Sequence, residues 1–99
     1  ETITVEEGPL MIGRGTKSDL RIPDSRVSRM HAVIERQRDS FMITDSSTNG
    51  TYVQIGDEEV IFLHREQLRL HGSGHLSLGR HVEAEDAKLL RFECQTLSP

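Results

Sequence analysis

Apolar and polar residues alternate over short stretches along the whole of this chain. Residues 2–5 alternate one by one, and residues 41–44 do so in part. Periods of two residues, and apolar runs of three to six residues, are typical of β-strands. Similar stretches follow at residues 30–34, 52–53, 60–63, 68–70, 76–78 and 89–92. The pattern therefore predicts a protein built from short strands.

Turn-forming residues separate these stretches. Gly, Pro, Asn, Asp and Ser gather at residues 7–9, 13–15, 23–25, 45–50, 56–57 and 72–74. Strands that recur every 8–12 residues between such turns indicate an all-β sandwich. The one plausible helical stretch, residues 83–90, is short and could equally be a loop that leads into the last strand.

Two long polar connections interrupt the strand pattern, at residues 14–30 and 45–51. In a sandwich, binding sites are built on the loops at one end of the sheets. These two connections are therefore where we expect the functional residues.

The composition is that of one small globular domain. The chain has 99 residues, of which 28% are charged and 34% hydrophobic. No apolar run approaches the ~18 residues of a membrane-spanning helix, and no signal peptide is evident, so we expect no membrane partner. Cys94 is the single cysteine, which fits a reducing compartment. Because the sequence starts at Glu1 and stops at Pro99, we expect residues 1–99 to be one domain cut from a larger intracellular protein.

The charge distribution narrows the choice of ligand. The formal net charge is −4, which argues against nucleic acid because a polyanion needs a broad basic surface. Residues 10–38 nevertheless carry seven basic and three acidic side chains. Such a local excess of positive charge is typical either of an anion site or of a solvated arginine-rich loop.

The first candidate segment is Gly13-Arg14-Gly15, which directly follows an apolar strand end. The glycines free the backbone to turn, and the guanidinium of Arg14 can hold a phosphate or carboxylate through two parallel hydrogen bonds. The glycine spacing fits no dinucleotide-binding or P-loop pattern, so the sequence implies no nucleotide cofactor.

The second segment runs from Ser25 to Ile34 and contains two serines and two arginines before an apolar stretch. Its hydroxyls and backbone amides could complete the coordination of a doubly charged anion. A hydrolase would pair Ser28 as nucleophile with His31 as base, but no Gly-x-Ser-x-Gly elbow is present. We therefore expect no catalysis, and we expect His31 to point inward and bind the loop backbone.

The third segment is Asp45-Ser46-Ser47-Thr48-Asn49-Gly50-Thr51. Asn49-Gly50 marks a tight turn that needs a positive φ angle, and the small polar side chains before it can bond to local backbone. A plain hairpin turn explains the Asn-Gly pair but not the polar residues that precede it.

In this order and spacing, the three segments resemble the forkhead-associated (FHA) domain, a family of phosphothreonine-peptide readers. The family pattern is Gly-Arg, then Ser-x-x-His, then Asp-x-Ser-x-Asn-Gly-Thr, separated by about fifteen residues each time. The flanking residues 19–24 and 76–79 also resemble the family, so the likeness spans roughly residues 2–92. It implies an eleven-stranded, antiparallel-type β-sandwich with the ligand loops, residues 13–17, 24–31 and 45–51, at one end.

The resemblance also implies roles for individual residues. Arg14 and Ser28 would bind the phosphate with support from Arg29. Thr48 would lie beside the phosphate and the threonine methyl, and Asn49 would hold the ligand backbone after the phosphothreonine. The residues expected to shape the loops without touching the ligand are Gly13, His31 and Gly50.

Arg26 corresponds in the family to a position that can read the third residue after the phosphothreonine. An arginine there predicts a preference for Asp or Glu at that ligand position. The implied partner is a phosphothreonine-containing protein or peptide in kinase-dependent signalling.

Some positions depart from the family pattern. Gln54 stands where Asn is common, and Gly72-Ser73-Gly74-His75 replaces the usual Gly-Asp. Neither change touches the expected phosphate contacts.

One alternative function is metal binding. The late histidines His64, His71, His75 and His81 match no zinc spacing, so we expect no metal site. The remaining alternative is a scaffold of the same fold that binds unmodified partners through its sheet surface.

Overall fold

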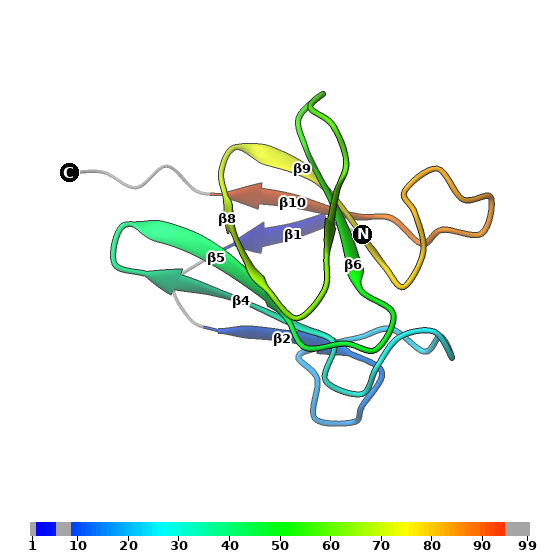
Figure 1. Ribbon diagram of the computed structural model, residues 1–99. Helices are drawn as coiled ribbons and strands as arrows, with labels where there is room; N and C mark the ends of the chain where they lie inside the picture. Colours follow the sequence, from blue (N-terminus) through cyan, green and yellow to red (C-terminus); the bar gives the residue numbers. More distant parts are fainter. Residues whose placement is uncertain (1, 6–8, 95–99) are drawn as a thin grey trace.

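Two five-stranded β-sheets pack face to face in the computed structural model, which describes residues 2–5 and 9–94 (Figure 1). One sheet has the strand order β1-β10-β9-β6-β7, and the other has the order β3-β2-β4-β5-β8. The strands are β1 (Thr2–Val5), β2 (Leu10–Gly13), β3 (Leu20–Arg21), β4 (Ala32–Gln37), β5 (Ser40–Asp45), β6 (Thr51–Ile55), β7 (Ile61–Leu63), β8 (Gln67–Leu70), β9 (Ser73–Leu78) and β10 (Leu90–Cys94). The predicted all-β sandwich is confirmed, with ten strands in the described residues where the resemblance implied eleven.

Most neighbouring strands run antiparallel, as the short connections require. The β4–β5 hairpin is closed by two residues, with Gln37 opposite Ser40 and Ala32 opposite Asp45. Two pairs are parallel, β1 with β10 and β2 with β3. Among the described residues, no helix is long and apolar enough to cross a membrane.

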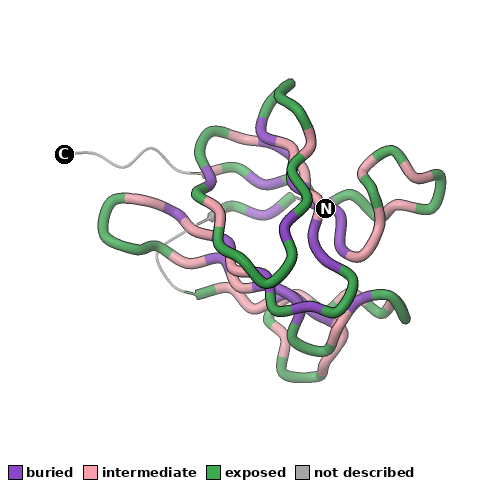
Figure 2. The backbone as a smooth tube through the Cα atoms, in the orientation of Figure 1, coloured by how far each residue is buried: buried purple, intermediate pink, exposed green. Residues whose placement is uncertain are grey.

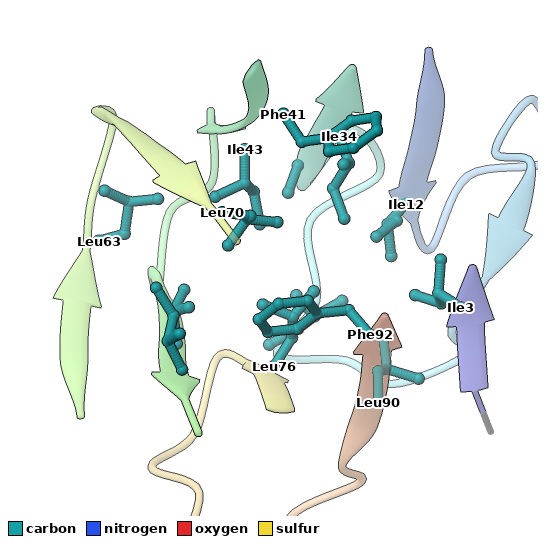
Figure 3. Packing of buried hydrophobic residues seen from close by; sticks show 14 of the residues in the cluster. Ile3, Ile12, Ile34, Phe41, Ile43, Leu63, Leu70, Leu76, Leu90 and Phe92 are labelled. Atoms are coloured by element: carbon teal, nitrogen blue, oxygen red, sulfur yellow. The ribbon is translucent and has the colours of Figure 1, made fainter. Parts of the chain in front are cut away.

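The core lies between the sheets, where the alternating side chains of both inner faces meet (Figures 2 and 3). In β5 every second residue is buried, and Phe41 and Ile43 point inward. Ile12 and Ile34 from the same sheet face Leu76 and Phe92 from the other. Sequence alternation therefore decides which side chains enter the core.

The same alternation buries polar residues at one end of the core. Asp45 is the last residue of β5 and Thr51 is the first of β6, and both occupy inward positions. Asp45 is 2% exposed and Thr51 is 0% exposed. Buried polar groups need hydrogen-bond partners. The hydroxyl of Thr51 donates to the carboxylate of Asp45, which also accepts hydrogen bonds from loop residues.

Two expectations about local structure need correction or refinement. Residues 72–74 were predicted as a turn, but Ser73 and Gly74 belong to β9. A Cβ atom on Gly74 would overlap the carbonyl oxygen of Gln54 and press on the ring of Phe92, so this glycine permits close packing and does not form a turn. Residues 83–90 form no helix; they are a loop of successive turns that leads into β10, which was the other expected outcome.

Strand direction brings four connections to the same end of the sandwich. β2, β5 and β9 end there, and β4, β6 and β10 begin there, because Ala32 pairs with both Ile12 and Asp45 while Thr51 pairs with Leu78. The loops after β2, β3, β5 and β9 lie together on the right of Figure 1, away from the β4–β5 hairpin. The candidate site is therefore assembled from segments that are distant in sequence.

We predict that Leu76→Ala lowers the free energy of unfolding by about 2–5 kcal/mol, because the leucine is fully buried and a cavity would remain. The matched control is Leu89→Ala, since Leu89 is 41% exposed and should cost less than about 1 kcal/mol. Urea denaturation of both variants measures the difference. Equal losses would contradict the placement of the core.

Candidate functional site

The loops that follow β2 and β3 are joined to each other by backbone hydrogen bonds. The amide of Arg14 donates to the carbonyl of Ser28 at 2.9 Å, and the amide of Gly15 donates to the carbonyl of Arg29 at 3.1 Å. These bonds set the first two candidate segments side by side, although about fourteen residues separate them in the chain. Arg14 and Ser28 are thus brought together by the backbone itself.

The side chain of Arg14 is oriented by one further bond. Its Nε donates to the carbonyl of Val27 at 2.9 Å, and the residue is half-buried. Within residues 2–5 and 9–94 the guanidinium has no other hydrogen bond or ion pair, so its two amino groups remain available. A fixed Nε with two free amino groups suits an anion that accepts two parallel bonds.

Gly13 is required by close packing and not by a turn. Its φ angle is not positive, and it lies inside β2. A Cβ atom here would overlap the carbonyl oxygen of Arg29. Gly13 therefore permits the close approach of the β3–β4 loop to the end of β2, where the sequence predicted a turn. The guanidinium of Arg29 has no partner among the described side chains and is exposed.

His31 is fully buried and joins the second loop to the third. Its Nδ1 accepts a hydrogen bond from the amide of Ser28 at 3.0 Å, while its Nε2 lies 2.8 Å from the carbonyl oxygen of Gly50. A carbonyl can only accept, so Nε2 carries the proton and Nδ1 does not. The inward, backbone-bound position expected for His31 is confirmed.

Burial lowers the pKa of His31 below its usual value of 6.5, against the opposing effects of the Gly50 carbonyl and the nearby Asp45 carboxylate. Asp45 Oδ1 lies 3.8 Å from Nε2. The neutral imidazole is therefore the stable form near pH 7, which agrees with its pattern of one donated and one accepted hydrogen bond.

These bonds also exclude the Ser28–His31 hydrolase. The bond to His31 comes from the backbone amide of Ser28, and both ring nitrogens are occupied by backbone groups. The Ser28 hydroxyl instead accepts a bond from the amide of Thr48 at 3.1 Å. No ring nitrogen is left to activate the hydroxyl, so the pair cannot act as nucleophile and base.

The loop after β5 is shaped by the buried carboxylate of Asp45. This group accepts bonds from the amide and hydroxyl of Ser47, from the hydroxyl of Thr51 and from the amide of Arg65, at 2.7–3.1 Å. Burial alone would raise the pKa of Asp45, but these bonds hold it below its usual value. The sequence suggested local bonding by Asp45; the contribution of Arg65 lies 20 residues away and carried no sequence signal.

Gly50 has the positive φ angle, 86°, that the Asn-Gly pair predicted. Its amide donates to the hydroxyl of Ser47 at 2.7 Å, and a Cβ atom here would overlap the ring of Phe62. The resulting turn leaves Thr48 and Asn49 exposed at the tip of the loop. The amide nitrogen of Asn49, Nδ2, donates to the carbonyl of Arg26 at 2.9 Å.

Arg26 lies at the edge of this cluster, with its side chain 54% exposed. The carboxylate of Asp24 holds its backbone amide at 2.9 Å. That hydrogen bond is the main reason why the pKa of Asp24 is lowered; burial opposes it, and Arg80 and Lys88 assist it. Sequence reasoning missed Asp24 and Arg80, because ion pairs between loops distant in sequence leave no local pattern.

The late histidines do not converge. Among the described residues, no group of three or more His, Cys, Asp or Glu side chains is placed to hold a metal ion. His81 lies against the ring of Tyr52, with centroids 5.3 Å apart, and His64 stacks on Phe62 at 6.0 Å.

An open hollow of about 330 Å³ borders the cluster on the side of Arg29. Met11 and Met30 contribute apolar walls, and Lys17 and Arg29 contribute cations. Met30 is 65% exposed and does not continue the buried pattern of β4, which begins two residues later.

Comparison with known proteins agrees with this architecture. Residues 10–79 match the model of the FHA domain family. The chain belongs to the FHA domain family. As an FHA domain it is a binding module and not an enzyme. The matched residues include the whole of the loops that follow β2, β3 and β5, but only the first residue of the loop that follows β9.

The domain is similar to several individual FHA proteins. It is 36% identical to the FHA domain-containing protein FhaA of Mycobacterium tuberculosis, over 71% of this chain but only 15% of that protein. Among solved structures it is similar to the FhaA FHA domain complexed with the intracellular domain of Rv3910, at 27% identity and a TM-score of 0.61, covering 88% of this chain and 82% of that one. It is also similar to a structure from a study of phosphothreonine-dependent FHA domain interactions, at 26% identity and a TM-score of 0.62, covering 96% and 82%.

The buried neutral His31 predicts a loss of stability in weak acid. In the unfolded chain the imidazole takes up a proton near pH 6.5, whereas in the folded domain it does so only at lower pH. The unfolded state therefore binds more protons below pH 6.5, and the contribution of His31 is complete above that pH and is lost as the pH falls through the folded pKa.

NMR titration of the His31 ring measures this pKa, and thermal melts across the same range measure the stability. A His31 pKa at or above 6.5, or a proton on Nδ1 at neutral pH, would contradict the bridge between the two loops.

Proposed function

We propose that this FHA domain binds phosphothreonine peptides through the cluster of Arg14, Ser28 and the β5–β6 loop. The main support is that the hydrogen-bond donors of Arg14 and Ser28 are held in place and have protons that are not used within the protein. The guanidinium of Arg14 is oriented by Nε while its amino groups stay free, and the hydroxyl of Ser28 accepts from Thr48 so that its own proton can point outward. Donors held in place with free protons are suited to a fixed anion.

The charge of the ligand fits this set of donors. A phosphate monoester carries about −1.5 to −2 charges and three acceptor oxygens at pH 7. Arg14 and Ser28 would bind it directly, and Arg29, exposed and without a side-chain partner in the described part of the chain, would add a further positive charge. Each charge-assisted hydrogen bond contributes about 1.5–3 kcal/mol, so the phosphate is expected to dominate the affinity.

The tip of the β5–β6 loop would recognise the peptide around the phosphothreonine. Thr48 is exposed next to Ser28, where it could contact the threonine methyl. A methyl group contributes about 0.8 kcal/mol by transfer alone, which corresponds to a roughly fourfold preference over phosphoserine. Asn49 uses Nδ2 to hold Arg26, which leaves its carbonyl oxygen to accept from the ligand backbone.

The third residue after the phosphothreonine would be read by Arg26. Its backbone is tied to the site by Asn49, and its side chain extends into solvent, so a ligand carboxylate can reach it. We therefore propose a preference for Asp or Glu at this ligand position.

The relatives support the class of partner. The solved FhaA FHA domain is complexed with the intracellular domain of Rv3910, and another similar structure, at 27% identity, is that of EmbR from Mycobacterium tuberculosis with a low affinity phosphopeptide. For this domain we propose that the ligand is a segment of a partner protein in which a kinase has phosphorylated a threonine. The chain spans 15% of the length of FhaA, so the proposal concerns the domain and not a whole protein.

One observation favours the second candidate, a scaffold that binds unmodified partners through its sheet surface. The edge strand β7 exposes Ile61 and Phe62, which are 39% and 49% exposed. The ring of Phe62 lies 4.8 Å from that of Tyr52, so the exposed surface continues onto β6. The ring of Phe62 also packs against Gly50, so this surface borders the β5–β6 loop.

Arg14→Ala is expected to weaken binding of a phosphothreonine peptide by more than about 100-fold, because two charge-assisted bonds worth about 3 kcal/mol or more are lost. Calorimetric titration measures the loss, with the unphosphorylated peptide as the ligand control. Arg69→Ala removes an equal charge from an exposed position on β8 and is the matched protein control. Equal binding of both peptide forms, or no loss in Arg14→Ala, would contradict the proposal.

Arg26→Glu tests the reading of the third following residue. The charge reversal should weaken a phosphothreonine peptide with Asp at that position by about tenfold or more, and should affect one with Ala much less, because only the first places like charges together. A fluorescence-anisotropy comparison of the two peptides measures the ratio. If both peptides respond equally, Arg26 does not read this position.

A further inference from the structure

We propose that Asp86 is an internal counter-ion for Arg26 that competes with an acidic residue of the ligand and so sets how strongly the domain selects it. The proposal rests on the proposed role of Arg26 in reading the third residue after the phosphothreonine. It assigns a specificity-determining function to the loop between β9 and β10.

Asp86 reaches the site because the β9–β10 loop lies at the same end of the sandwich as the loops that carry Arg14 and Ser28 (Figure 1). The Oδ2 atom of Asp86 lies 3.7 Å from a terminal nitrogen of Arg26. Both side chains are more than half exposed, at 60% and 54%. The carboxylate of Asp86 thus lies beside the guanidinium of Arg26, where a ligand carboxylate would have to bind.

The position of Asp86 is fixed from behind by Arg80. The guanidinium of Arg80 contacts the carboxylate of Asp86 and also donates to its backbone carbonyl at 3.1 Å. Arg80 itself is only 16% exposed, and its other terminal nitrogen pairs with Asp24 at 3.3 Å. An anchored carboxylate loses little conformational freedom on pairing, so it competes better than a freely rotating one.

The backbone of Arg26 is held in place, whereas its side chain is more than half exposed. Its amide is bound by Asp24 and its carbonyl by Asn49, each at 2.9 Å. The backbone of Gly79 packs so closely against the Arg26 carbonyl that a Cβ atom on the glycine would lie 2.7 Å from it. Only the guanidinium can therefore turn from Asp86 toward a ligand.

The charges around Arg26 explain why Asp86 matters. Arg80 and Lys88 both pair with Asp24, the latter at 3.8 Å. Asp86 is the second carboxylate in this group of three cations and two anions, and its Oδ2 atom is shared between Arg80, which it contacts more closely, and Arg26. Removing its charge should leave Arg26 unpaired and remove a repulsion toward an incoming carboxylate. The residue lies beyond positions 10–79, the part that matches the family.

The test compares Asp86→Asn with the wild-type domain by calorimetry, using two phosphothreonine peptides that differ only in Asp or Ala at the third following position. Exposed ion pairs are weak, so the expected gain is about two- to fivefold in affinity for the Asp peptide. The affinity for the Ala peptide should remain nearly unchanged. The ratio of the two affinities is therefore the quantity that moves.

Two further variants separate competition from a change in loop structure. Glu85→Gln removes the same charge one residue away, where the side chain is exposed and unpaired among the described residues, and should leave the ratio as it is. In the Arg26→Gln background, Asp86→Asn should no longer change the ratio, because the competed group is gone.

Each outcome decides between the proposals. An unchanged ratio in Asp86→Asn, or an equal effect on both peptides, overturns the role of Asp86 while phosphopeptide binding by the wild type stands. A ratio that rises equally in Glu85→Gln also overturns it, since overall charge would then be the cause. If neither wild type nor variant binds either peptide, the proposed function itself fails, and the role of Asp86 fails with it.

Discussion

The arrangement of the site depends on the two hydrogen bonds of the buried His31 imidazole. Nδ1 of the ring accepts a hydrogen bond from the amide of Ser28, and Nε2 donates one to the carbonyl of Gly50. One side chain therefore fixes the β3–β4 loop relative to the β5–β6 loop. Without that bridge the amide of Ser28 would lose its partner, at a cost of about 1–3 kcal/mol. The carbonyl of Gly50 would keep only the hydrogen bond from the amide of Gly79 at 2.9 Å. The neutral form favoured by burial is the form that can make both bonds.

A second constraint is electrostatic and acts at the surface. The whole chain is acidic, with a formal net charge of −4, whereas the loops at one end gather arginines. Buried carboxylates there serve the protein: Asp45 shapes a loop, and Asp24 holds Arg26 and Arg80. The guanidinium groups of Arg14 and Arg29 are not paired with these carboxylates. A small site for one phosphate is compatible with an acidic body that repels larger polyanions.

Much of this could be predicted from the sequence, because local rules determine it. Strand alternation placed the core, the Asn-Gly pair required a positive φ angle at Gly50, and the spacing of the three motifs indicated the family. The sequence could not reveal packing between distant segments. Gly74 was assigned to a turn although it makes room for Gln54 and Phe92. Arg80 and Asp86 also escaped notice, because their ion pairs join the β9–β10 loop to Asp24 and Arg26.

We propose that one end of the sandwich holds a single phosphate through Arg14 and Ser28. Chemical-shift mapping of the ¹⁵N-labelled domain with a phosphothreonine peptide tests it most directly. We expect the largest shifts at the amides of Arg14, Ser28 and Thr48, and we expect no such shifts with the unphosphorylated peptide. Shifts centred on Phe62 and the rest of β7, equal for both peptides, would contradict it and favour the scaffold.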